Sequence, residues 1–177
     1  MTLKHPSRGD ALMKRHLLFL LCAAPLVAYA ADTPDASFYK HLTEGGLAEI
    51  SDGTMAAESA TDPKLKDFGS MMVKDHTAAN DKLAALAATK GVTLPTSASV
   101  SEMAEHAKLK LLSGDTFDKS YIKGQIKAHR ETVRLLRREI ATGKDADAQG
   151  FAKSVLPTIE GHLKAIRAIA KDEGVTD

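Results

Sequence analysis

Two histidines take the places of aliphatic residues in hydrophobic stripes along the chain, and a third lies on or beside such a stripe. Around His129, aliphatic residues recur at three- and four-residue steps, which is the spacing of one face of an α-helix. His162 fills the missing position of a second such stripe, and His76 lies beside a third. We therefore expect these imidazoles to face the interior of a helical bundle. The aliphatic residues of the first two stripes are Ile122, Ile126, Val133, Leu136 and Ile140, and Val155, Ile159, Ile166 and Ile169.

Glu49 is the fourth ionisable residue if the stripe that contains it faces inward, a direction for which Leu47 and Ile50 compete. Counted from the nearest turn at about 1.5 Å per residue, Glu49 and His76 lie at a depth of roughly 18 to 21 Å. His129 and His162 lie roughly 21 to 27 Å from the other turn. All four are therefore expected near the middle of the bundle.

Two interpretations of these four polar residues at a common depth remain open. A carboxylate and three neutral imidazoles are oxygen and nitrogen ligands, which suit a divalent zinc, iron, manganese or copper ion. Alternatively, each histidine forms a hydrogen bond to a neighbouring helix, because buried polar groups need partners whether or not a metal is present.

Turn residues divide the chain into segments of helical periodicity. Asp62-Pro63, Gly91 with Pro95, Gly114-Asp115 and Gly143-Lys144-Asp145 separate them. The first and second long helices, and the third and fourth, are joined by a few residues, so each pair must form an antiparallel hairpin. The link from 91 to 114 is long enough to cross the length of the bundle. The predicted helices span residues 36–60, 63–90, 115–142 and 145–173, with a short helix at 100–112 that starts at Ser99 with a capping-box spacing to Glu102.

The first thirty residues have the three parts of an export signal. A basic start precedes an apolar run of eleven residues, 17–27, which is too short to span a membrane as an anchor. Ala28-Tyr29-Ala30 predicts cleavage after Ala30, with Met13 as an alternative start that would make residues 1–12 an over-long gene start. Cys22 is the only cysteine, so the exported chain has no thiol for disulfides, thiolate metal sites or nucleophilic catalysis.

The length and composition predict one helical domain over residues 31–177, and the export signal predicts that this domain is periplasmic. Cleavage after Ala30 would remove four basic residues and one acidic residue, so that 20 basic and 22 acidic residues remain, for a net charge of −2. This balance does not indicate nucleic acid as a partner. The sequence shows no glycine-rich phosphate loop and no serine elbow. We therefore predict no catalytic residues and no enzymatic activity.

A basic stripe is predicted beside the core face of segment 115–142. Such a stripe either makes weak contact with an anionic envelope surface or an acidic partner, or pairs with acidic residues of a neighbouring helix in solvent. His41 and His106 lie outside the core stripes and are expected to be solvated. The basic residues are Lys123, Lys127, Arg130, Arg134 and Arg137.

Several motifs in order resemble one family of exported bacterial proteins, domain of unknown function 4142, whose members are often labelled outer-membrane proteins. The resemblance covers residues 36–172 and implies a ferritin-like four-helix bundle, but no reaction. By position it adds Asp75, Asp118 and Tyr121 as residues that support the four candidate ligands. The motifs are the runs Phe68 to His76, Gly91 to Pro95 and Gly114 to Tyr121, and Leu156-Pro157 with His162.

The sequence departs from the ligand pattern of ferritin-like di-iron enzymes. Those enzymes use Glu-x-x-His pairs, whereas Val73, Ile126 and Ile159 precede the three histidines here by three residues. The sequence therefore predicts a non-enzymatic periplasmic helical bundle with a binding or stress-related role in the envelope. The alternative is a metal-binding or redox protein that uses Glu49, His76, His129 and His162.

Overall fold

The computed structural model of the chain describes residues 1–2 and 35–176, and this part folds as five α-helices. The expected signal peptide, its cleavage after Ala30 and the alternative start at Met13 lie outside the described residues. The helical ends differ from the sequence prediction by at most three residues, so the predicted all-α fold class is confirmed. The helices are α1 (Ala36–Ser59), α2 (Pro63–Thr89), α3 (Val100–Leu109), α4 (Gly114–Thr142) and α5 (Ala146–Asp172).

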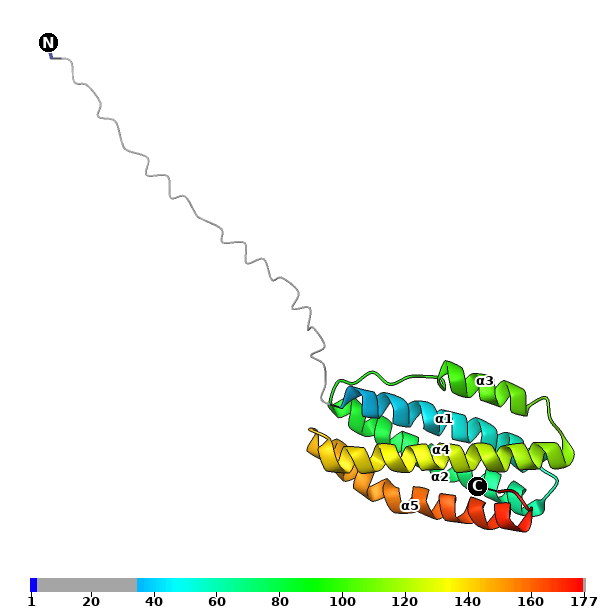
Figure 1. Cartoon of the computed structure of the whole chain (residues 1–177). Coiled ribbons are helices and arrows are strands. Elements are labelled where there is room, and N and C mark those ends of the chain that lie inside the picture. Colours follow the sequence, from blue (N-terminus) through cyan, green and yellow to red (C-terminus); the bar gives the residue numbers. More distant parts are fainter. Residues whose placement is uncertain (3–34, 177) are drawn as a thin grey trace.

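Two antiparallel hairpins form the bundle. Helices α1 and α2 make one hairpin, α4 and α5 make the other, and α1 packs on α4 while α2 packs on α5. The connection from α2 to α4 runs back along the bundle and carries α3, which lies against α1 (Figure 1). This is the long crossover predicted from the sequence.

Helix starts are fixed by side chains that accept backbone hydrogen bonds. Asp62 accepts from the amide of Lys64 at the start of α2, where Pro63 occupies the first turn and needs no acceptor. Ser99 and Glu102 form the predicted capping box of α3. Asp145 accepts from the amide of Asp147 at the start of α5. The starts of these three helices are therefore encoded by residues next to them in the sequence.

Close contact between α1 and α2 depends on two glycines. A Cβ atom on Gly53 would lie 2.8 Å from the carbonyl oxygen of Gly69, and one on Gly69 would lie 2.5 Å from the carbonyl oxygen of Gly53. Since backbone atoms cannot move aside as a side chain does, larger residues at either position would push the helices apart.

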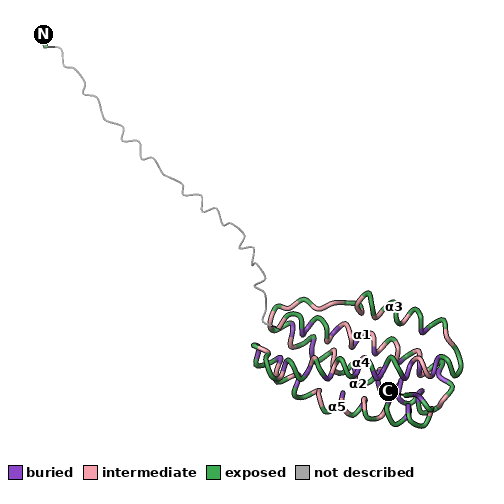
Figure 2. The backbone as a smooth tube through the Cα atoms, viewed as in Figure 1, coloured by how far each residue is buried: buried purple, intermediate pink, exposed green. Residues whose placement is uncertain are grey.

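The hydrophobic core consists of two clusters, one towards each end of the bundle. Leu65, Phe68, Met72 and Ile166 belong to one cluster, and Phe38, Leu83, Leu136 and Ile159 to the other. The buried backbone positions in Figure 2 follow the inner sides of the long helices. Along each long helix, one buried ionisable residue separates the two clusters, and these residues are Glu49, His76, His129 and His162.

The stripe on α4 differs in part from its prediction. Gln125 and Glu139 are buried, whereas Ile140 is only partly buried. Ile140 lies in the last turn of α4, where the bundle covers only part of its side chain. In α5, Pro157 is exposed and lies within the helix. None of the helices in the described part of the chain combines the length and hydropathy needed for a membrane span.

Candidate metal centre

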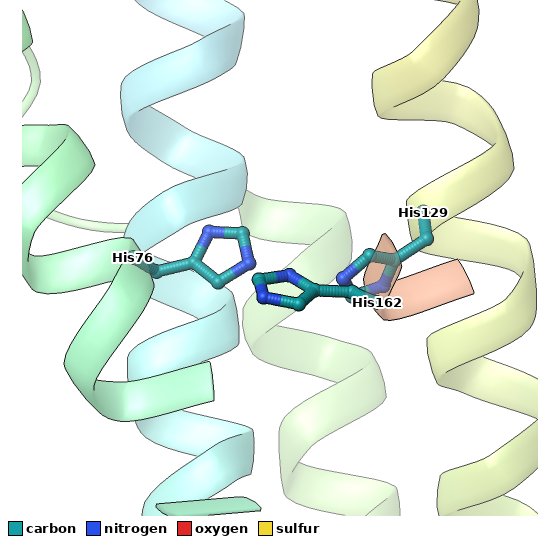
Figure 3. A group of neighbouring side chains, drawn as sticks. All are labelled: His76, His129 and His162. Carbon is teal, nitrogen blue, oxygen red and sulfur yellow. The ribbon is translucent and has the colours of Figure 1, made fainter. Parts of the chain in front are cut away.

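Three imidazoles from three helices meet in the middle of the bundle. His76 comes from α2, His129 from α4 and His162 from α5, and each side chain is at least 94% buried. One nitrogen of each ring lies within 4.8 Å of one nitrogen of each other ring. The ring centroids are 5.5 to 5.7 Å apart, and Figure 3 shows the rings gathered between the helices.

Two of the rings have a defined tautomer, because the nitrogen that points away from the centre forms a hydrogen bond. The Nδ1 of His129 lies 3.0 Å from the carbonyl oxygen of Gln125, and the Nε2 of His162 lies 3.0 Å from Oδ2 of Asp75. Both oxygens only accept, so each of these nitrogens carries the hydrogen and donates. The other nitrogen of each neutral ring is left with a free lone pair, as in metal-binding histidines oriented by a carbonyl or carboxylate.

Each ring also has one buried nitrogen without a hydrogen-bond partner among the described residues: Nε2 of His76, Nε2 of His129 and Nδ1 of His162. A buried polar atom without a partner costs roughly 1 to 3 kcal/mol. Three such atoms in one small region are therefore expensive for the isolated bundle. A shared ligand would satisfy all three at once.

Burial keeps the imidazoles neutral. Loss of solvation, together with the neighbouring His129 and His162, lowers the pKa of His76 to about 3. Burial lowers the pKa of His129 to about 4. Burial also lowers the pKa of His162, although the hydrogen bond to Asp75 opposes this shift. At neutral pH all three nitrogens are therefore unprotonated and able to donate a lone pair to a metal.

Aromatic rings close one side of the centre. The ring of Phe68 lies two helical turns before His76 on α2, and its centroid is 6.3 Å from that of His129 and 6.5 Å from that of His162. Tyr121 packs behind Phe68 at 6.3 Å. These rings make this side of the centre aromatic, and Phe68 has no atom that can bind a metal.

Glu49 faces inward as predicted but lies outside the group of three histidines. Its Oε1 is 3.7 Å from Nδ1 of His129, the nitrogen that already donates to a carbonyl. Its Oε2 accepts a hydrogen bond of 2.7 Å from Nε2 of Gln125. Burial raises the pKa of Glu49 to about 8. The structure therefore brings three of the four predicted ligands together and places Glu49 behind the His129 ring.

The chain matches a known protein family over most of its length. The family described as Domain of unknown function (DUF4142) matches residues 22–169. The chain belongs to this family. A search of the curated proteins found no match to this DUF4142 chain.

Solved structures confirm the fold of this DUF4142 chain. A DUF305 fragment from Deinococcus radiodurans superposes with a TM-score of 0.69 at 12% identity, over 78% of this chain and 95% of that one. CopM in its Cu(I)-bound form superposes with a TM-score of 0.66 at 16% identity, over 78% of this chain and 96% of CopM. CopM in an Ag-bound form gives a TM-score of 0.64 at 16% identity, over 78% and 95%. At these identities the likeness shows a common helical fold.

The remaining predicted residues have separate places. Asp75 orients His162, as described above. Asp118 accepts from the amides of Thr61 and Asp62 and so fixes the turn between α1 and α2. It lies eleven residues before His129, roughly 16 Å along α4, and is not part of the centre. His106 is only partly exposed, because its Nδ1 lies 2.6 Å from Oδ1 of Asp52 and joins α3 to α1, so the prediction that it is solvated was wrong.

Gln125 was missed by the sequence interpretation. Its carbonyl orients His129 and its side chain binds Glu49, so it links the two candidate ligands. The sequence signal was available, because Gln125 lies four residues before His129 and therefore on the same helical face. A glutamine in a helix is most often solvated, however, and its burial became visible only in the structure.

Residues of the basic stripe pair with acidic neighbours. Lys127 lies 2.7 Å from Glu105, Arg137 lies 2.7 Å from Glu160, and Arg134 lies 3.9 Å from Glu131. This is the solvated, paired arrangement that the sequence left open as one alternative. Contact of the stripe with an anionic envelope surface stays a prediction.

Proposed function

We propose that the protein is a non-enzymatic copper-binding protein of the bacterial envelope, with one copper ion held by His76, His129 and His162. The observation that carries the proposal is the set of three buried, unpartnered ring nitrogens within 4.8 Å of one another. Nitrogen atoms bound to one ion at about 2.0 Å lie about 3.3 to 3.5 Å apart. The nitrogens must therefore approach one another by up to about 1.5 Å when an ion binds.

The donor set favours copper over the other metals considered. All three donors are imidazoles, and the affinity of nitrogen sites for divalent ions of this series is highest for copper. Manganese and magnesium favour oxygen ligands, which the group of three lacks. Structural zinc sites have four protein ligands, whereas Cu(I) accepts three, and the aromatic wall of Phe68 supplies no fourth ligand.

The related structures give independent support. CopM, which shares the fold at 16% identity, was solved in Cu(I)- and Ag-bound forms. A bundle of this architecture therefore accommodates such ions. The position of the site in this chain is argued from its own histidines alone.

Placement in the periplasm rests on the N-terminal sequence. The basic start, the apolar run and Ala28-Tyr29-Ala30 together match an export signal. The processed chain would have no cysteine, so copper there cannot be bound by thiolates. Buried histidines then provide a site that is not lost by disulfide formation in an oxidising compartment.

Metal titration of the processed protein tests the proposal. Protein purified from cells is stripped with a chelator and titrated separately with Cu(II), with Cu(I) under argon against a coloured chelator, and with Zn(II). We expect one copper per chain and tighter binding of copper than of zinc. His41→Ala is the matched control, because this histidine is exposed and lies outside the centre.

The variants His76→Leu and His162→Leu should lose the copper that His41→Ala retains. Wild-type protein that binds no stoichiometric metal would refute the proposal. Equal copper binding by wild type and His76→Leu would refute the site. Tighter binding of zinc would keep the site and overturn the choice of metal.

A further inference from the structure

A cleft with acidic walls lies on one side of the bundle, between α1, α3 and α4. Its volume is about 590 Å³. Helix α3 forms its outer wall, because the crossover holds this helix alongside α1 (Figure 1). Two lysines, Lys40 and Lys127, also line the cleft. Its acidic lining residues are Glu44, Glu49, Asp52, Glu102, Glu105 and Glu131.

The floor of the cleft reaches the candidate metal centre. Glu49 and Gln125 line the cleft, yet their side chains are 6% and 2% exposed. The Oε1 of Gln125 is buried and has no hydrogen-bond partner in the described part of the chain. The Oε1 of Glu49 is 3.7 Å from Nδ1 of His129, so the floor of the cleft lies beside that ring. Both offer oxygen atoms to a cation.

The other side of the centre offers a poor path for an ion. A cavity beside His76 has a volume of about 20 Å³, which is room for about one water molecule. Its walls are mostly apolar, with Leu42, Leu83, Val155 and Ile159 among them. A partly hydrated cation loses solvation there without gaining a charged partner.

We infer that the metal ion reaches the three histidines through this acidic cleft, and that Glu49 and Gln125 bind it in passing at the floor. The inference rests on the proposed function, since it concerns the path to the same site. Apart from Glu49, whose pKa burial raises to about 8, five carboxylates and two lysines line this concave surface. The excess of negative charge concentrates cations and raises their association rate. The two buried oxygens then replace part of the hydration shell before the imidazoles bind the ion.

Rapid mixing of the processed wild-type protein with Cu(II) tests the path. The chain has no tryptophan, and Tyr121 packs on Phe68 beside the centre, so quenching of tyrosine fluorescence reports copper arriving there. Glu49→Gln keeps the size of the side chain, and the new amide can still form a hydrogen bond to Gln125. We expect this variant to bind Cu(II) at least about tenfold more slowly, with a dissociation constant within about threefold of wild type.

A surface variant tests the same path without touching the buried floor. Glu44→Gln with Glu131→Gln removes two charges from the cleft rim and should slow association and weaken its dependence on salt. The matched control is Asp67→Asn with Asp81→Asn, which removes two exposed charges on α2 that do not line the cleft. This control should associate at the wild-type rate. Circular dichroism confirms that each variant is folded.

The outcomes separate the path from the site. Slower association of both cleft variants at unchanged affinity supports the inference. Copper binding at the wild-type rate in both variants overturns the path and leaves the proposed function intact. Loss of affinity in Glu49→Gln equal to its loss of rate also overturns the path, because Glu49 would then stabilise the bound state. If wild type binds no copper, the proposed function and the path fail together.

Discussion

Two buried polar groups of this bundle differ in how their hydrogen bonds are satisfied. Near one end, Asp145 is 9% exposed, and both of its carboxylate oxygens have partners. Its Oδ2 accepts from the hydroxyl of Tyr39 at 2.9 Å, and its Oδ1 accepts from Lys90 at 3.1 Å and from the amide of Asp147 at 2.9 Å. In the middle of the bundle, three histidines each keep one nitrogen without a partner.

The difference separates a structural network from a binding site. The Asp145 network is complete within the chain, so it needs nothing further and serves to tie α1, α2 and α5 together. The histidine centre is complete only on its outer side, where Gln125 and Asp75 accept from two of the rings. Incomplete hydrogen bonding at well-oriented buried atoms therefore points to a ligand.

The largest expected effect is the loss of metal binding in His76→Leu. Removal of one of three ligands should weaken copper binding at least about 100-fold, as measured by chelator competition. The metal-free variant should be as stable as wild type or more stable, because leucine replaces a buried nitrogen that has no partner. A large loss of stability without metal would mean that the histidine is structural, like Asp145.

The second effect is expected from Asp145→Ala, which should lower stability and leave copper binding unchanged. Asp145→Ala leaves the Tyr39 hydroxyl without its acceptor and removes the cap of α5, so the free energy of unfolding should fall by about 2 kcal/mol. Urea denaturation of the metal-free protein measures this change. Copper affinity should stay at the wild-type value, and a change of more than about threefold would show that the two regions are coupled.

A third, smaller effect tests the orientation of His162. Asp75→Asn replaces an acceptor of the Nε2 hydrogen by an uncharged amide, which should weaken copper binding about tenfold. Asp67→Asn on the same helix is the control, since Asp67 is exposed. Unchanged affinity in Asp75→Asn would show that packing alone orients the ring.

The smallest effect is expected from pH, because two contributions oppose each other in the metal-free protein. The histidines have a lowered pKa in the fold, so the unfolded chain binds more protons below about pH 6.5, and their contribution to stability falls as the pH drops towards 4. Glu49 has a raised pKa, so its contribution is present below about pH 4.5 and is lost as the pH rises towards 8.

Urea midpoints at pH 7 and pH 5.5 measure the balance of these contributions. Three histidines oppose one carboxyl group, so the midpoint should be lower at pH 5.5. Glu49→Gln removes the opposing contribution and should make the fall larger, whereas His76→Leu should make it smaller. A midpoint that rises on acidification in wild type would contradict the assignment of neutral buried histidines.

Much of the fold could be predicted from the sequence, because its signals are local. Asp62-Pro63 and the Ser99–Glu102 capping box fix helix starts within a few residues, and aliphatic periodicity identifies the buried faces. Burial of His129 and His162 followed from the same periodicity. Their common depth also followed, since the rise per residue of a helix is constant.

The tertiary structure decided which of these residues meet. The direction of Glu49 was ambiguous in the sequence, because Leu47 and Ile50 on the same helix are apolar and compete for the inward direction. The rotation of α1 is set by its contact with α2 through Gly53 and Gly69. The position of Glu49 behind His129, and the role of Gln125 between them, depend on the packing of α1 on α4. Sequence spacing determines height along a helix, but only packing between helices determines which atoms come within bonding distance.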